Sequence, residues 1–139
     1  MCLRGSLVLA IALLLTAAAC GKGNSGASSP STSSKTEMFT GTVNVGQSDS
    51  HPFTVTQTGE VDVTLTAAGP PSTITMGIGV GTAGGSACTL LTGASTTTAA
   101  GTAVQLAGTV TAGSFCVEVY DAGNQTAPVT YSITVTHPS

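Results

Sequence analysis

The chain contains little charge and few aromatic residues, and it is poorest in bases. Charged residues make up 6% and aromatic residues 4% of its 139 residues, and tryptophan is missing. The three bases, Arg4, Lys22 and Lys35, all precede residue 36, whereas residues 37–139 hold all six acids and neither Lys nor Arg. Nucleic-acid binding and adhesion to anionic lipid both depend on Lys and Arg. We therefore expect residues 37–139 to bind neither.

What the chain does have is 41% hydrophobic residues, beginning with a short apolar run near the N-terminus. Arg4 precedes an apolar stretch at 7–19, which at about 13 residues is shorter than the roughly 20 needed to span a bilayer. Its length and flanks are typical of a signal peptide. Residues 17–20 read Ala-Ala-Ala-Cys. These small residues predict cleavage before Cys20, so that residues 1–19 form the signal.

The fate of Cys20 has two interpretations. The small residues before it resemble the bacterial lipobox, which implies that the thiol is diacylated and anchors the protein in a membrane. Ala17 departs from the lipobox pattern, which usually has Leu there. By resemblance to Gram-negative lipoproteins, Gly21 permits sorting to the outer membrane. The expected location is thus the bacterial cell envelope, at the outer membrane or cell surface in a Gram-negative host. The alternative is an ordinary secreted protein.

Residues 20–36 are predicted to form the lipidated N-terminus and a flexible linker. The segment after Cys20 reads GKGNSGASSPSTSSKT, which is rich in Gly and Ser and has no large apolar residue to bury. Such a chain behaves as a random coil with a reach on the order of 20–25 Å. We expect it to hold the following domain off the membrane surface.

Two cysteines remain for the mature domain, because Cys2 leaves with the signal and Cys20 receives lipid. Cys88 and Cys116 are therefore predicted to form a disulfide in an oxidising compartment. A zinc site is the alternative, but it needs four ligands at close spacing. The predicted bridge closes a loop that stabilises the fold by on the order of 3.5 kcal/mol.

Residues 37–139 follow a pattern of period two. Apolar side chains alternate with Thr, Ser, Gln and acids, and no helical stripe is present. Strands with one dry and one wet face give this pattern, and Gly- and Pro-rich turns separate them. The predicted fold class is an all-β sandwich of seven to eight strands over 37–139. The expected turns lie at 46–50, 58–59, 69–71, 81–86, 93–101, 112–113 and 121–128. The expected core comprises Val43, Val45, Phe53, Val55, Val61, Val63, Leu65, Ile74, Met76, Ile78, Val80, Val104, Leu106, Val110, Phe115, Val117, Val119, Val129, Tyr131, Ile133 and Val135.

Several segments resemble the bacterial pre-peptidase C-terminal (PPC) domain family. They are FTGTV at 39–43, HPFTV at 51–55, TAGSFCVEVYD at 111–121 and PVTYSITVT at 128–136. The similarity covers about residues 37–137. It implies a jelly-roll-like antiparallel β-sandwich that serves as a non-catalytic appendage of secreted proteases and other exported proteins, and relatives include collagen-binding modules. We expect no protease domain to be attached to this chain, which departs from that setting.

Residue patterns for catalysis or metal binding are weak. We interpret Asp49 and His51 as part of a solvated turn and His137 as a frayed C-terminus. The remaining acids are assigned to a solvated face, so neither catalytic residues nor a cofactor is predicted. Some modules related to the PPC family bind calcium through clustered acids near the N-terminus, but only Asp49 lies between residues 38 and 59. A weak calcium site that uses carboxylates and turn carbonyls, including Asp62 and Asp121, stays an alternative.

These observations favour a non-catalytic envelope lipoprotein that is anchored through Cys20 and presents a β-sandwich for protein binding or structural support. Its expected partners are the membrane and an unknown envelope protein or glycan. The second interpretation is a carbohydrate-binding module. Sugar platforms use exposed aromatic rings, and Tyr120 is the one aromatic residue predicted on the wet face. The third, an enzyme, lacks a supporting set of residues.

Overall fold

The computed structural model describes residues 32–139, so the predicted signal, Cys20 and most of the linker lie outside the described part. These residues form eight strands. No helix among residues 32–139 is long and apolar enough to cross a membrane. The strands are β1 (Ser34–Val43), β2 (Ser48–Val55), β3 (Gly59–Gly69), β4 (Thr75–Gly84), β5 (Ala87–Ala99), β6 (Leu106–Val110), β7 (Gly113–Asp121) and β8 (Val129–Pro138).

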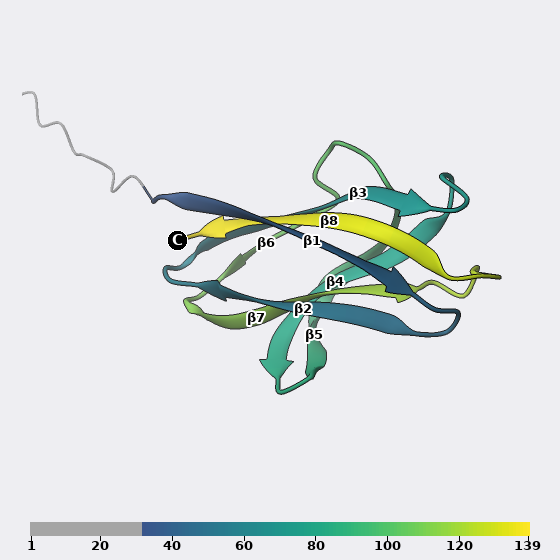
Figure 1. Ribbon diagram of the computed structural model, residues 1–139. Helices are drawn as coiled ribbons and strands as arrows, with labels where there is room; N and C mark the ends of the chain where they lie inside the picture. Colours follow the sequence, from purple (N-terminus) through teal and green to yellow (C-terminus); the bar gives the residue numbers. More distant parts are fainter. Residues whose placement is uncertain (1–31) are drawn as a thin grey trace, which may run out of the picture.

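Two four-stranded antiparallel sheets pack face to face (Figure 1). The first sheet has the order β1-β8-β3-β6, and the second has the order β2-β7-β4-β5. The chain changes sheet at every connection except between β4 and β5, which form a hairpin. This double-sheet arrangement of eight strands is a jelly roll. The predicted fold class is confirmed.

The core lies between the sheets and is built from alternate residues of each strand. Val63, Leu65, Ile78 and Ile133 are fully buried there. Most of the expected core positions are confirmed, because a period-two pattern buries one face of each strand. Two were wrong. Val45 follows the end of β1 and is 50% exposed, and Val104 precedes β6 and is 51% exposed.

Several boundaries differ from the sequence-based prediction. Residues 81–84 of the expected turn at 81–86 lie in β4, and residues 48–50 of the expected turn at 46–50 lie in β2. Strand β1 begins at Ser34, three residues before the expected start of the domain, because Ser34 to Thr36 pair with Pro138 to Thr136 at the end of β8. The segment 93–101, expected to be a turn, lies largely in β5. The side chains of β5 that turn toward the protein include Thr96 and Thr98, which are only partly buried. An apolar alternation is therefore missing from this strand.

Glycines on β4 leave space for groups of the two neighbouring strands, β5 and β7, to lie against the β4 backbone. A Cβ at Gly77 would overlap the ring of Tyr120, and one at Gly81 would overlap the backbone carbonyl of Thr89 on β5. Without side chains at these two positions, the neighbouring groups lie directly on the β4 backbone.

A disulfide joins Cys88 of β5 to Cys116 of β7, as predicted. The two Cα atoms are 5.8 Å apart, although β4 lies between the two strands. Gly81 of β4 pairs with both Leu90 and Cys116, so the bridge crosses β4 where it has no side chain. The loop that it closes carries most of β5 and all of β6.

Candidate functional site

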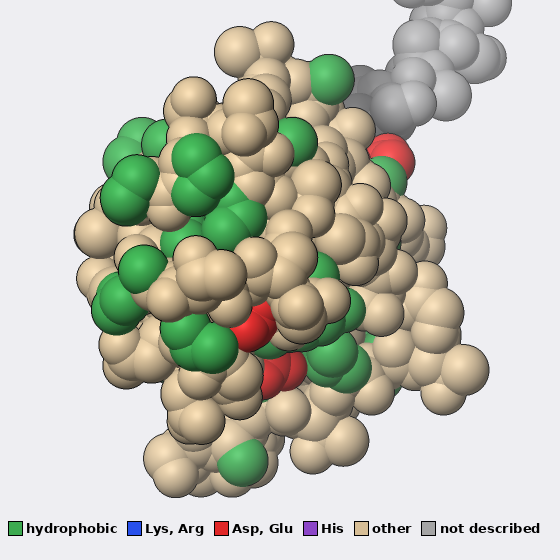
Figure 2. Space-filling view, turned by 90° about the vertical axis from the view of Figure 1, so that its right-hand side faces the viewer, with side chains coloured by type: hydrophobic (Ala, Val, Ile, Leu, Met, Phe, Trp, Pro, Cys, Tyr) green, Lys and Arg blue, Asp and Glu red, His purple; other side chains and the backbone are tan. Residues whose placement is uncertain are grey.

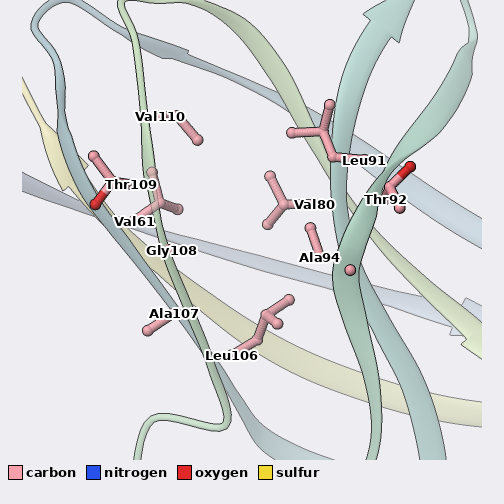
Figure 3. A pocket seen from close by; sticks show the side chains of 11 residues that line it. Val61, Val80, Leu91, Thr92, Ala94, Leu106, Ala107, Gly108, Thr109 and Val110 are labelled. Carbon is pink, nitrogen blue, oxygen red and sulfur yellow. The ribbon is translucent and has the colours of Figure 1, made fainter.

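A cleft opens between the two sheets along the side formed by β5 and β6, and we call it the edge cleft. Its volume is about 210 Å³. The side chains that form its base are buried, whereas Leu91 at its rim is 37% exposed. Figure 3 shows aliphatic side chains from both sheets facing one another across it: Val61, Leu106 and Val110 from the first sheet, and Val80, Leu91 and Ala94 from the second. The edge cleft is thus an apolar hollow that solvent reaches.

The two strands that border the edge cleft lack charge and proline, which are two of the usual protections against strand pairing. Strands β5 and β6 are the outer strands of their sheets at this side. Neither contains a charged residue or a proline. Native proteins usually place charges or proline on outer strands, because the free backbone groups there can pair with another chain. The β5 and β6 side is therefore chemically suited to contact with another polypeptide.

The opposite side of the sandwich is closed by polar and aromatic side chains between β1 and β2. Phe39 of β1 stacks on the ring of His51 of β2, with centroids 4.8 Å apart and planes 7° from parallel. Pro52 also lies in β2. These contacts close the gap between the two sheets on this side, whereas the gap on the β5 and β6 side stays open as the edge cleft. The two sides of the sandwich therefore differ in both chemistry and access.

Asp49 and His51 lie in β2 rather than in a solvated turn, so that expectation was wrong. The Tyr131 hydroxyl donates a hydrogen bond to Asp49 Oδ2 at 2.7 Å and lies 2.8 Å from His51 Nε2. Since the single hydroxyl proton points to Asp49, Nε2 of His51 donates to the hydroxyl oxygen. A side chain at Gly41 of β1 would overlap the Asp49 carboxylate. This cluster ties β2 of the second sheet to β8 of the first.

Burial, followed by the hydrogen bond to Asp49, raises the pKa of Tyr131 far above its ordinary value of 10.0. Both effects disfavour the phenolate, since a buried anion beside a carboxylate is doubly unfavourable. The hydroxyl therefore stays protonated and keeps its role as a donor.

His137 is part of the fold, and the expectation of a frayed C-terminus was wrong. Its side chain is 1% exposed, because β8 continues to Pro138 and pairs with β1. Its Nε2 lies 3.0 Å from Glu37 Oε1, and its Nδ1 lies 2.9 Å from the Pro138 carbonyl oxygen. The ring packs on Phe53 with centroids 5.3 Å apart. The end of the chain is thus held by both polar and aromatic contacts.

The pKa of the Glu37 carboxyl is lowered from its ordinary value of 4.5. The largest cause is the hydrogen bond from Lys35, whose Nζ lies 3.0 Å from Oε1, and the second is the hydrogen bond from His137. Donors that favour the carboxylate lower a pKa in this way. Glu37 is therefore the acceptor that joins the beginning of β1 to the end of β8.

Acidic side chains occupy the outer surfaces, and bases are scarce. Lys35 is the only Lys or Arg among residues 32–139. Figure 2 shows the end of the sandwich toward which β1 and β3 run, where acidic side chains lie among apolar ones and no basic side chain is visible. On β3, Glu60 and Asp62 lie opposite Thr109 and Ala107 of β6. Neither acid forms an ion pair with another described residue.

Asp121 organises two neighbouring turns. Its carboxylate accepts hydrogen bonds from the backbone N–H groups of Gly46, Gly123, Asn124 and Gln125. These bonds lower the pKa of Asp121, with Gly46 as the largest cause. Asp62 lies on the other sheet. The structure therefore does not bring together the two acids that the sequence suggested as calcium ligands.

Among residues 32–139, no three His, Cys, Asp or Glu side chains gather where they could hold a metal ion. Calcium binding stays the alternative to the predicted absence of a cofactor. Calcium raising the melting temperature, with the increase abolished in Asp62→Asn or Asp121→Asn, would support it.

The Tyr120 ring is only partly free. One side of the ring lies on the β4 backbone at Gly77, and the residue lines an open groove together with Gln47, Ser48 and Glu118. Its predicted position on the wet face is correct. The ring combines an apolar surface with adjacent polar groups, which is the composition that sugar binding uses.

Comparison of the chain with protein-family models, with curated proteins and with solved structures gave no match. The function must therefore be argued from the residues themselves. The predicted lipidation residue, Cys20, lies outside the described residues. The edge cleft and the cluster around Tyr131 were not identified from the sequence. The one available signal for the edge cleft was the uncharged, small-residue composition of 87–110.

Proposed function

We propose that this chain is a non-catalytic bacterial envelope lipoprotein, anchored through Cys20, whose jelly-roll domain binds another protein. The observation that carries the proposal is the edge cleft, an apolar hollow bordered by two outer strands without charge or proline. Surfaces of this composition are uncommon on proteins that have no partner. Structural support of an envelope assembly is included in this function, because it uses the same kind of contact.

Two further observations support an envelope location. The Cys88–Cys116 disulfide is typical of oxidising compartments outside the cytoplasm. The domain begins at Ser34, after a Gly- and Ser-rich segment that follows Cys20. In the proposed arrangement this segment is the tether between lipid and domain. The jelly-roll fold agrees with what the resemblance to the PPC family implies, and we propose membership of that family on the segments quoted above.

The anchor is tested by cell fractionation. Wild-type protein is expected in the membrane fraction, and Cys20→Ser is expected in the soluble exported fraction, since acyl chains on the cysteine supply the membrane affinity. Gly21→Ala serves as the matched control and should stay with the membrane. Retention of Cys20→Ser in the membrane fraction would overturn the proposed anchor.

Protein binding is tested by photo-crosslinking in intact cells. A photoreactive amino acid at Leu91, on the rim of the edge cleft, is expected to give a discrete adduct with another protein. The same group at Thr40, on the outer face of β1, is the control and should give none. Adducts of equal yield from both positions would show random collision and would contradict a binding role for the edge cleft.

Carbohydrate binding is the second candidate, and the position of Tyr120 favours it. The ring borders an open groove of about 430 Å³ that also contains Gln47 and Glu118. In this alternative a sugar stacks on the ring while the polar side chains bind its hydroxyls. A glycan array is the test, with Tyr120→Ala as the variant. Glycan hits that disappear in this variant would favour this function, and an array without hits would discard it.

A further inference from the structure

The edge cleft indicates what kind of polypeptide binds there, and this inference rests on the proposed protein-binding function. We propose that β6 accepts an extended strand from another protein, which extends the first sheet. The aliphatic side chains on one face of this strand enter the edge cleft, and Lys or Arg side chains on its other face approach Glu60 and Asp62.

The backbone of β6 is the template for such a strand. β6 pairs with β3 in a continuous antiparallel register from Leu106 to Val110, and no strand within residues 32–139 lies on its other side. Pairing between β4 and β5 is interrupted around Gly79 and Gly81. An irregular outer strand is a poor template for pairing. Of the two strands that border the edge cleft, β6 is therefore the one that a partner extends.

The volume of the edge cleft decides what enters it. At about 210 Å³ it is smaller than the roughly 300–1,000 Å³ of sites for small organic ligands. It has room for about one or two aliphatic side chains, and its lining is aliphatic. Side chains of a strand alternate between its two faces, so every second residue of an added strand would face the edge cleft. These positions of the partner are therefore aliphatic.

The acidic residues of β3 determine which side chains we expect on the face of the partner strand that points away from the edge cleft. Glu60 and Asp62 lie on the outer face of β3, opposite Thr109 and Ala107 of β6. Figure 3 shows the Ala107 and Thr109 side chains pointing away from the edge cleft. Because both are small, a Lys or Arg from a strand beside β6 can extend across them toward the two carboxylates. Attraction between opposite charges across β6 would favour a basic partner strand over an acidic one.

The same charges argue against a second copy of this chain as the partner. Residues 37–139 contain six acids and no Lys or Arg. A second domain would bring more acid to a surface that has unpaired carboxylates, and like charges disfavour association. The partner is thus a different protein with an extended segment that alternates aliphatic and basic residues.

The probe for this proposal is an acetylated peptide that alternates valine and lysine over about eight positions, a typical strand length. It is titrated into the exported Cys20→Ser protein, isotopically labelled for NMR. We expect saturable shifts confined to β6, β3 and the residues that line the edge cleft. A peptide that alternates valine and glutamate is the charge control, and we expect binding at least about tenfold weaker.

Two variants separate the roles of cleft and charge. A Cβ at Gly108 of β6, which lines the edge cleft, would meet no atom within 4 Å, so we expect the side chain of Gly108→Leu to extend into the cleft. It should abolish peptide binding while the NMR spectrum stays that of a folded domain. The double variant Glu60→Gln/Asp62→Asn should weaken binding of the lysine peptide about tenfold and remove its preference over the glutamate peptide. Glu118→Gln, on the second sheet, is the matched control and should bind normally.

The outcomes distinguish this inference from the proposed function. Shifts that map to other strands, equal binding of the two peptides, or undiminished binding by Gly108→Leu would each overturn strand addition at β6. Self-association of the protein without peptide, lost in Gly108→Leu, would overturn the choice of a different protein. Protein adducts at Leu91 in cells together with a failed peptide titration would retain the proposed function and reject this inference. Absence of adducts would reject the proposed function itself.

Discussion

Removal of the Cys88–Cys116 disulfide gives the sharpest test of how this domain is stabilised. The bridge closes a loop of 28 residues. The chain-entropy relation gives about 3.6 kcal/mol of stabilisation at 25 °C for a loop of that length, because the bridge restricts the unfolded chain. Unfolding a domain of this size carries an entropy of about 2.1 cal/mol/K per residue, so the melting temperature should fall by about 15 °C.

The assay compares the oxidised protein, the reduced protein and the double variant Cys88→Ala/Cys116→Ala. Tryptophan is missing, so unfolding is followed by far-UV circular dichroism in urea and on heating. The reduced protein and the double variant should agree with each other and lie about 3.6 kcal/mol below the oxidised protein in free energy of unfolding.

The position of the loop adds a local expectation. It contains most of β5 and all of β6, which border the edge cleft. Amide hydrogen exchange should therefore accelerate more in β5 and β6 than in β3 or β8 after reduction. A loss of less than about 1 kcal/mol in both reduced protein and double variant would refute the entropic reasoning. Uniform acceleration over all strands would refute the local part.

Three further predictions concern single residues. The lowered pKa of Glu37 means that its carboxylate stabilises the fold above pH 4.5 and that this contribution is lost as the pH falls through the lowered pKa. Glu37→Gln should therefore reduce the acid dependence of the urea midpoint, and equal slopes in wild type and Glu37→Gln would contradict this. Tyr131→Phe removes a hydroxyl that is hydrogen-bonded to a carboxylate and an imidazole. The free energy of unfolding, measured in urea, should therefore fall by about 1.5–3 kcal/mol. An unchanged value would show that this cluster does not stabilise the fold. Gly77→Ala should destabilise the protein by about 1–3 kcal/mol, because the new methyl overlaps an aromatic ring. Gly108→Ala places its methyl in open space and should raise stability by about 0.5–1 kcal/mol. Shifts of the melting temperature in the same direction for both variants would refute this difference between the two glycines.

The sequence predicted those features that depend on local pattern. Alternation identified the core faces of β3, β7 and β8, since a strand with one buried face must place apolar residues at every second position. Cys88 and Cys116 were predicted to pair because separate fates were expected for the other two cysteines, and the structure joins them. Local pattern failed at β5, where the partly buried positions include threonines and a turn was expected.

The polar residues show the limit of this reasoning more clearly. Asp49 and His51 look like parts of a solvated turn, and His137 looks like a loose end. Their true environments depend on Tyr131, Glu37 and the pairing of β1 with β8, which are distant in sequence. A histidine two residues from a terminus becomes buried only when the terminal strand is paired.

The sequence by itself determined the class of fold, the composition of the core, the disulfide and the separation of charge along the chain. Each of these depends on side-chain type and on spacing within a short stretch. The tertiary structure alone decided which strands are outermost, and therefore that β5 and β6 border an open apolar cleft while β1 and β2 close the other side. Strand order in a sheet arises from pairings between distant segments, and the alternation of each strand is the same whichever neighbour it has.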